Sequence, residues 1–139
     1  CLYLQKLNYK IIIVSNQSGI SRGIYSEKDY QTLTNWMIKK FSLNGIKFLD
    51  IIHCPHDPSE NCNCRKPKPG MFLKADKIHN IDFKKSWMIG DKEIDILAAN
   101  AAGIFNTILV RSGHPIIEES SNSLFILDSI KESMSVILN

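Results

Sequence analysis

The sequence predicts an α/β fold, a three-layer Rossmann-like parallel sheet with helices on both faces and an inserted loop of metal ligands. Short β-branched apolar runs alternate along the chain with longer amphipathic segments, which is the pattern of parallel β-α-β units. Small polar, acidic or metal-ligating residues follow directly on three of the apolar runs. Because ligands bind beyond the carboxyl ends of the strands in such sheets, these residues indicate a single active site.

The first half of the chain is expected to contain two helices and two strands. Residues 1–8, CLYLQKLN, indicate a helix already in progress, because no capping residue precedes them. Residues 10–19, KIIIVSNQSG, predict a buried strand that runs into a polar loop. A helix should begin at Ser26, with Asp29 completing an imperfect capping box, and end at Gly45. Its expected apolar face comprises Tyr30, Leu33, Met37 and Phe41, and FLDIIHC, residues 48–54, predicts the second strand.

The second half continues the same alternation. Pro69 suits the first turn of a helix whose apolar face would be Phe72, Ala75 and Ile78. SWMIGD, residues 86–91, predicts a third strand, and the Ala-rich segment 93–102 predicts a helix that Gly103 ends. TILV, residues 107–110, predicts a fourth strand, which RSGHP follows as a loop. The segment 124–138 is expected to contain a short fifth strand and a final helix.

Length and composition fit one globular domain spanning residues 1–139, which we expect to be truncated at its N-terminus because the chain starts within a helix. The chain has 139 residues, 44 % of them apolar, and a net charge of +3. That mild charge gives only weak support for a nucleic-acid partner. No apolar run approaches the ~20 residues of a membrane span. Closely spaced cysteines look like metal ligands, which favours a reducing compartment over a disulfide framework. We therefore expect a cytoplasmic monomer that binds neither nucleic acid nor a membrane.

The most specific feature is a cluster of soft metal ligands in the loop after the second strand. Cys54, His56, Cys62 and Cys64 provide three thiolates and an imidazole, with Pro, Asp, Ser, Glu and Asn between them. Four such ligands form a closed tetrahedral set with no position for water, which is typical of structural zinc. The alternative is that they are small buried residues and an unrelated histidine, but the polar residues between them do not resemble a core. His53 belongs to the strand end, and we expect it to stay uncoordinated.

Three further segments carry polar residues that suit a phosphorylated ligand. SNQSG, residues 15–19, offers hydroxyl and backbone N–H groups, although many strand-to-loop junctions contain such residues. CRKPKPG, residues 64–70, is a basic loop in which two prolines restrict the backbone beside Lys66, whereas most basic loops are simply solvated. Asp91 ends the third strand, where a carboxylate suits Mg²⁺, and capping the next helix is the alternative role.

Together these segments resemble the haloacid dehalogenase superfamily of phosphatases. The order Ser-Asn-Gln after a strand, Lys-Pro in a middle loop and Gly-Asp-x-x-x-Asp later is similar to motifs II, III and IV of that superfamily. The cysteine loop with its Arg-Lys-Pro continuation, SNQSGISRG and RSGHP resemble a narrower subgroup, the D-glycero-D-manno-heptose 1,7-bisphosphate 7-phosphatases and the related histidinol-phosphatases. This resemblance covers about residues 1–115. It implies Mg²⁺ and Zn²⁺ as cofactors and a small phosphorylated substrate, most simply a sugar bisphosphate used in making heptose precursors.

The resemblance also implies a role for each matching residue. Ser15 would hydrogen-bond the transferring phosphoryl group, and Lys66 would neutralise its charge. Asp91 would bind Mg²⁺, while Asp95 would orient its neighbours. The residues expected to contact the substrate are Asn16, Gln17, Ser18, Arg65 and Lys92. Zinc would hold the Arg65–Lys66 segment over the site.

The chain lacks the Asp-x-Asp motif that supplies the nucleophile and the general acid and base in this superfamily. Asp50 is the nearest match, but Ile51 and Ile52 follow it where the motif needs polar residues, so we place it inside a strand. One interpretation is that the chain is part of an active phosphatase whose nucleophile lies upstream, and that these 139 residues alone are inactive. The alternatives are a histidinol-phosphate phosphatase or a non-catalytic, zinc-stabilised module that binds phosphate.

Overall fold

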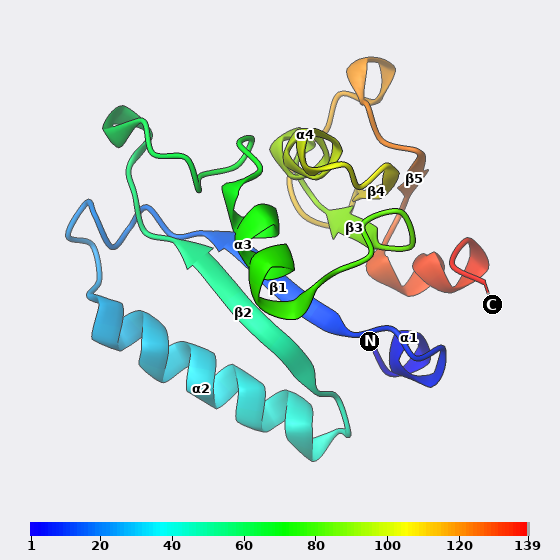
Figure 1. Ribbon diagram of the computed structural model, residues 1–139, viewed down its shortest axis with the longest axis horizontal. Helices are drawn as coiled ribbons and strands as arrows, with labels where there is room; N and C mark the ends of the chain where they lie inside the picture. The colour runs from blue at the N-terminus through cyan, green and yellow to red at the C-terminus, as the bar shows by residue number, and fades with distance from the viewer. Residues whose placement is uncertain (139) are drawn as a thin grey trace. The chain divides into compact units, whose positions relative to one another are not determined.

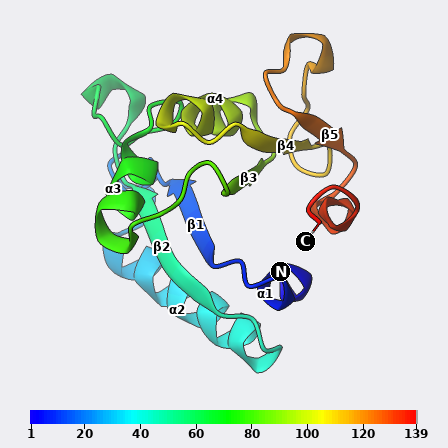
Figure 2. The same ribbon diagram turned by 45° about the vertical axis from the view of Figure 1, so that its right-hand side comes forward.

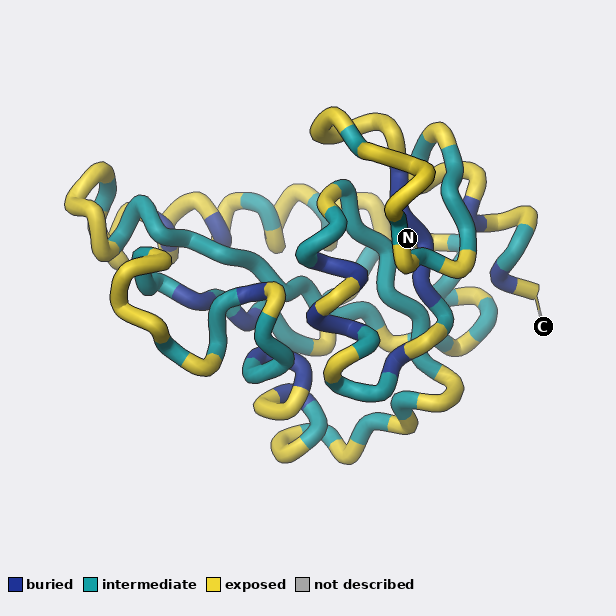
Figure 3. Tube along the Cα trace, turned by 90° about the horizontal axis from the view of Figure 1, so that it is seen from above, coloured by how far each residue is buried: buried dark blue, intermediate teal, exposed yellow. Residues whose placement is uncertain are grey.

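A computed structural model describes residues 1–138 of the chain as two compact units, residues 1–62 and residues 63–138 (Figure 1). Buried residues are interspersed with intermediate and exposed ones along the trace (Figure 3). All paired strands are parallel, and each unit contains one hydrogen-bonded sheet, so the predicted α/β class with parallel strands is confirmed. Among residues 1–138, no helix has the length and apolar character required to cross a membrane.

The first unit contains a two-stranded parallel sheet and a long crossover helix. Its elements are α1 (Leu2–Lys6), β1 (Ile11–Asn16), α2 (Glu27–Leu43), β2 (Phe48–Cys54) and the 3₁₀ turn η1 (Pro58–Glu60). The parallel register places Asn16 opposite Cys54, so both strands end at the same edge of the sheet. Two ring contacts join α2 to β2: Tyr30 lies 4.2 Å from His53 and Phe41 lies 5.0 Å from Phe48, measured between ring centroids.

The start of α2 follows the local sequence closely. The Ser26 hydroxyl accepts a hydrogen bond from the Asp29 N–H at 3.1 Å, and the Asp29 carboxylate accepts one from the Ser26 N–H at 2.9 Å. The predicted capping box is therefore present. Hydrogen bonds from the Ser26 hydroxyl and N–H lower the pKa of Asp29, so its carboxylate stays ionised at the positive end of the helix.

Leu33 lies on the predicted apolar face of α2 but is 64 % exposed. Tyr30 and Thr34 are the buried residues of this helix. They lie one turn apart on one side of the helix, and Leu33, three residues after Tyr30, lies on that side as well. Leu33 lines a cavity of about 500 Å³ between α2 and β1 together with Tyr30, Thr34 and Met37, so this part of the apolar face is not covered.

The second unit contains a three-stranded parallel sheet in the order β3-β4-β5. Its elements are α3 (Gly70–His79), β3 (Trp87–Gly90), α4 (Glu93–Ala102), β4 (Asn106–Val110), η2 (Glu118–Ser120), β5 (Phe125–Leu127) and η3 (Ile130–Ser135). Helix α4 packs against β3 and β4 (Figure 2). Fully buried side chains from these elements form the core of the unit: Ile96, Ala98, Ala99, Ile108 and Leu109.

Two expectations for this unit need correction. Ile78 was expected on the buried face of α3 but is 57 % exposed, because the helix ends at His79 and burial is confined to its first turns, at Met71, Phe72 and Ala75. The final helix is present as the 3₁₀ segment Ile130–Ser135. Its Ser133 hydroxyl donates to the Ile130 carbonyl at 2.7 Å, a hydrogen bond of the kind by which serine competes with regular α-helical bonding.

Candidate metal centre and phosphate site

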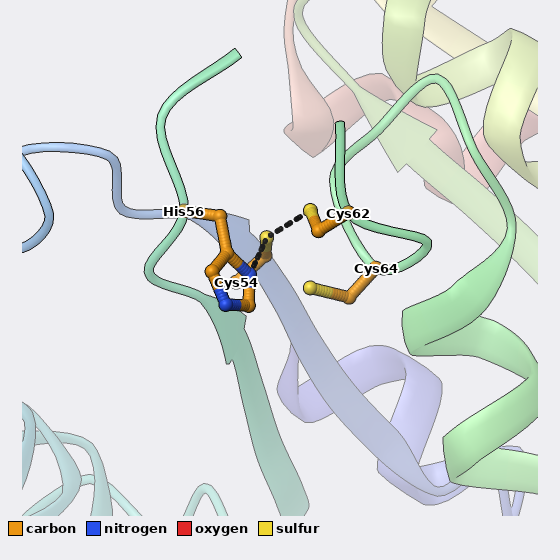
Figure 4. Close-up of side chains that lie close together, drawn as sticks. All are labelled: Cys54, His56, Cys62 and Cys64. Carbon is orange, nitrogen blue, oxygen red and sulfur yellow. Dashed lines mark hydrogen bonds between the residues drawn. The ribbon is translucent and has the colours of Figure 1, made fainter. Parts of the chain in front are cut away.

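The four predicted metal ligands lie close together in the loop that follows β2 (Figure 4). One ligand atom from each of Cys54, His56, Cys62 and Cys64 lies within 4.8 Å of all the others. The Sγ atom of Cys54 is 3.5 Å from both His56 Nδ1 and Cys62 Sγ. Among residues 1–138, no disulfide bond joins any of the cysteines.

A short capped turn brings the two ends of this loop together. Asp57 Oδ1 accepts a hydrogen bond from the Ser59 N–H at 3.0 Å, and Glu60 Oε1 accepts one from the Asp57 N–H at 2.7 Å. Asn61 then adopts a left-handed backbone conformation, with φ of 46°, which asparagine tolerates better than most residues. The turn therefore returns the chain so that Cys62 approaches Cys54.

The chemistry and spacing of the cluster fit a bound metal ion. Thiolates at about 2.3 Å and an imidazole at about 2.0–2.1 Å from a tetrahedral zinc place the ligand atoms roughly 3.5–3.8 Å apart. The 3.5 Å separations around Cys54 fall in that range. His53 lies outside the cluster, since its Nε2 contacts Glu27 Oε1 at 2.9 Å. The cluster could hold a metal ion, and its donor set is one that zinc favours.

The loop after β1 carries the predicted phosphate-binding residues in a hydrogen-bonded chain. Ser15 and Asn16 are the last two residues of β1, and Gln17 and Ser18 begin the loop. Gln17 Nε2 donates to Ser15 Oγ at 2.7 Å, and Tyr25 donates its hydroxyl proton to Gln17 Oε1 at 2.6 Å. A side chain at Gly19 would overlap the Tyr25 ring, so glycine permits this contact. Tyr25 was not identified from the sequence, because its role depends on the loop folding back over Gly19.

Backbone hydrogen bonds attach this loop to the cysteine loop. The Gln17 N–H donates to the Cys54 carbonyl at 2.7 Å, and the Ser21 N–H donates to the Pro55 carbonyl at 3.2 Å. The Ser21 hydroxyl also donates to the Glu60 carboxylate, and this hydrogen bond lowers the pKa of Glu60. These hydrogen bonds connect the cysteine loop directly to the loop that follows β1.

In the second unit, Lys66 is held in a buried ion pair. Its Nζ lies 2.6 Å from Asp95 Oδ1, with only 9 % and 7 % of the two side chains exposed. Asp95 Oδ2 also accepts a hydrogen bond from the Lys92 N–H at 3.2 Å, at the start of α4. The Asp95 carboxylate lies against Gly90, where any side chain would overlap it. Asp95 thus contacts the ammonium group of Lys66 close to the carboxyl end of β3.

Asp91 follows β3 directly and lies at the same strand end. Its Oδ2 is 2.5 Å from His114 Nδ1, and Gly113 packs against its carboxylate. Arg65 is partly buried next to Lys66, whereas Lys92 is exposed next to Asp91. From the sequence, RSGHP was predicted as the loop after the fourth strand and as part of the resemblance, with no role for Gly113 or His114. Gly90 pairs with Leu109 in parallel, so β3 and β4 end at the same edge of the sheet. The loop after β4 therefore emerges beside Asp91.

Comparison with known proteins adds a family and several relatives. A family model described as "HAD-hyrolase-like" matches residues 63–133. A Vibrio cholerae serotype O1 protein called D-glycero-beta-D-manno-heptose-1,7-bisphosphate 7-phosphatase is 47 % identical over 137 residues, covering 93 % of this chain and 74 % of the relative. A Photorhabdus laumondii protein named for the alpha anomer of that substrate is 45 % identical over 141 residues, covering 93 % and 77 %.

Solved structures share the fold. The D,D-heptose 1,7-bisphosphate phosphatase from B. bronchiseptica, crystallised with magnesium and phosphate, superimposes with a TM-score of 0.80 at 24 % identity, covering 96 % of this chain and 76 % of that one. A HAD-like phosphatase from Mesorhizobium loti also gives a TM-score of 0.80, at 22 % identity, with coverage of 97 % and 66 %.

Proposed function

We propose, since this chain belongs to the haloacid dehalogenase-like hydrolases, that it hydrolyses a phosphate monoester and removes the 7-phosphate of D-glycero-D-manno-heptose 1,7-bisphosphate. The observation that carries this proposal lies at the carboxyl end of β3. Lys66 contacts Asp95, Asp95 contacts the Lys92 N–H, and Lys92 follows Asp91. A fixed ammonium group and a carboxylate suited to Mg²⁺ therefore lie at one strand end. The proposed substrate is the one named for two relatives that are 47 % and 45 % identical to this chain.

In this proposal each residue acts on the substrate through ordinary charge and hydrogen-bond chemistry. Asp91 is the Mg²⁺ ligand, because Mg²⁺ prefers carboxylate oxygens together with substrate phosphate. Bound Mg²⁺ neutralises charge on the phosphoryl group. Lys66 adds a second positive charge, and Ser15 donates its hydroxyl proton to a phosphoryl oxygen while its own oxygen accepts from Gln17. The residues proposed to contact the rest of the substrate are Asn16, Gln17, Ser18, Arg65 and Lys92.

The aspartyl-phosphate route requires an attacking carboxylate that residues 1–139 do not provide in an Asp-x-Asp motif. Asp50 does not suit this role, because it lies within β2 and its Oδ1 accepts a hydrogen bond from the Ile51 N–H at 2.7 Å. The proposal therefore assigns the nucleophile to sequence upstream of Cys1 in the same reading frame.

We further propose that the cysteine cluster binds structural zinc. Four protein ligands leave no position for a reacting water, so this ion would stabilise the loop without taking part in catalysis. Through the backbone hydrogen bonds that the Cys54 and Pro55 carbonyls accept, it would order the loop that carries Gln17. Through Cys64 it would restrain Arg65 and Lys66. The close spacing of Cys54, Cys62 and Cys64 is typical of metal ligands and supports a reducing cytoplasm. There we propose that the protein acts as a monomer on a small sugar bisphosphate.

Phosphate release by the protein expressed from its whole reading frame tests the proposal. The substrates are both anomers of heptose 1,7-bisphosphate and histidinol phosphate, each with and without Mg²⁺. We expect one equivalent of phosphate from a heptose bisphosphate, heptose 1-phosphate as the product, and a much smaller kcat/KM for histidinol phosphate. Faster release from histidinol phosphate would assign the protein to the other branch of its subgroup. Absence of release from all three substrates would contradict the proposed hydrolysis.

A further inference from the structure

We propose that the loop of residues 111–118, called here the β4 loop, positions the Asp91 carboxylate for Mg²⁺ through Gly113 and His114. This inference rests on the proposed role of Asp91 as the Mg²⁺ ligand. It goes beyond that role by assigning a function to a loop that lies outside the phosphate-binding and metal-binding segments.

The first observation is the close approach of Gly113 to Asp91. A Cβ atom at position 113 would lie 2.7 Å from Asp91 Cγ and would overlap its carboxylate oxygen. The backbone at Gly113 can therefore contact the carboxylate only because it has no side chain. Since β3 and β4 are parallel neighbours with Gly90 paired to Leu109, the β4 loop emerges at the strand end that carries Asp91.

The second observation is the contact from His114. Its Nδ1 lies 2.5 Å from Asp91 Oδ2, so the Nδ1–H donates to the carboxylate. With Gly113 packed on one side and His114 bonded to Oδ2, the carboxylate has a defined orientation. We assign Oδ1 to the cation. Groups that hydrogen-bond a metal ligand in this way orient it and affect its affinity for the ion.

The third observation is that the β4 loop is itself held in shape at its base. Arg111 donates from Nε and Nη2 to the two carboxylate oxygens of Glu118, at 2.7 and 2.8 Å, and from Nη1 to Asp128 at 2.8 Å. The Arg111 N–H donates to the Leu127 carbonyl at 2.9 Å, where β5 ends. Such two-point guanidinium–carboxylate pairing fixes geometry as well as charge. The ends of the loop are thereby closed, and Gly113 and His114 lie between them.

Variants at these positions separate positioning from general stability. His114→Ala removes the donor, whereas His114→Asn keeps an N–H group at a similar distance from the backbone. Gly113→Ala adds the side chain that would displace the carboxylate. Ser112→Ala is the matched control, since Ser112 is an exposed residue of the same loop. Each variant is made in the protein expressed from its whole reading frame, and its melting temperature is compared with that of the wild type.

Two quantities are measured: the Mg²⁺ dissociation constant by isothermal titration calorimetry, and the Mg²⁺ concentration that gives half-maximal phosphate release. We expect both to rise at least about tenfold in His114→Ala and Gly113→Ala, as for other groups that support a metal ligand. Turnover at saturating Mg²⁺ should stay near the wild-type value. His114→Asn and Ser112→Ala should behave as the wild type.

The variant Asp91→Asn is measured in the same way. It distinguishes a failure of the ligand assignment for Asp91 from a failure of the positioning role of the β4 loop. If Asp91→Asn loses Mg²⁺ binding while His114→Ala and Gly113→Ala bind it as the wild type does, the positioning role of the β4 loop is refuted. If Asp91→Asn itself binds Mg²⁺ normally, the ligand assignment under the proposed function is refuted, and the inference with it. A lower turnover at saturating Mg²⁺ without any change in the dissociation constant would also overturn the positioning role.

Discussion

Replacement of Asp95 by asparagine should destabilise the protein strongly, because it leaves the buried ammonium group of Lys66 without its carboxylate. The two side chains are 7 % and 9 % exposed and lie 2.6 Å apart. Removal of one partner from such a pair costs about 3–5 kcal/mol, whereas whole domains are stable by only about 5–15 kcal/mol. For a chain of this size the loss corresponds to a melting temperature lower by roughly 10–20 °C. Equilibrium urea unfolding in the presence of zinc measures it, with an unchanged m-value expected.

A surface pair supplies the control for this prediction. Asp82 is 57 % exposed and its carboxylate lies 3.9 Å from Lys85, so Asp82→Asn should change the free energy of unfolding by less than about 1 kcal/mol. The double variant Lys66→Met/Asp95→Leu replaces both charges with apolar groups and should recover most of the lost stability while remaining inactive. The reasoning is refuted if Asp95→Asn loses less than about 1 kcal/mol, or if the double variant is as unstable as the single one.

Two further predictions concern the metal cluster and the base of the β4 loop. Cys62→Ser should reduce bound zinc, measured by elemental analysis, from about one equivalent to a small fraction. The melting temperature should also fall, since structural zinc contributes on the order of 10 kcal/mol to folding. An unchanged melting temperature in the metal-free protein would contradict this prediction. Hydrogen bonds from Arg111 lower the pKa of Glu118 below its usual value of 4.5 in the folded protein. The stability that this pair contributes is therefore fully present above pH 4.5. It is lost as the pH falls through the pKa of Glu118 in the folded state. The difference in unfolding free energy between the wild type and Glu118→Gln should therefore shrink between about pH 6 and pH 3 in urea titrations, and a constant difference would refute the effect.

Most of the elements could be predicted from the sequence because their signals are local. The Ser26–Asp29 capping box and the positive φ of 98° at Gly103 are determined by the residues themselves and their immediate neighbours. The cluster of three cysteines and one histidine was found in the same way, since its members lie within residues 54–64. In each case the local structure depends on few contacts with residues that are distant in the sequence.

The parts that could not be predicted depend on contacts between distant residues. The sequence indicated roles for Lys66 and Asp95 separately, but their pairing depends on where the segment before α3 meets the start of α4. His114 is 23 residues from Asp91 and approaches it because β3 and β4 are neighbours in the sheet. The exposure of Leu33 and Ile78 likewise depends on which part of each helix is covered by the rest of the fold, which periodicity alone does not determine.

The most direct test is the Mg²⁺-dependent release of phosphate from heptose 1,7-bisphosphate by the whole-reading-frame protein and its Asp91→Asn variant, with zinc content measured in the same samples. We expect the wild type to release one equivalent of phosphate only when Mg²⁺ is present. The variant should retain its zinc and lose activity by at least about a thousandfold, because it lacks the carboxylate that we propose as the ligand of the charge-stabilising ion. Turnover in Asp91→Asn close to that of the wild type, or equal release by the wild type without Mg²⁺, would contradict the proposed phosphatase site.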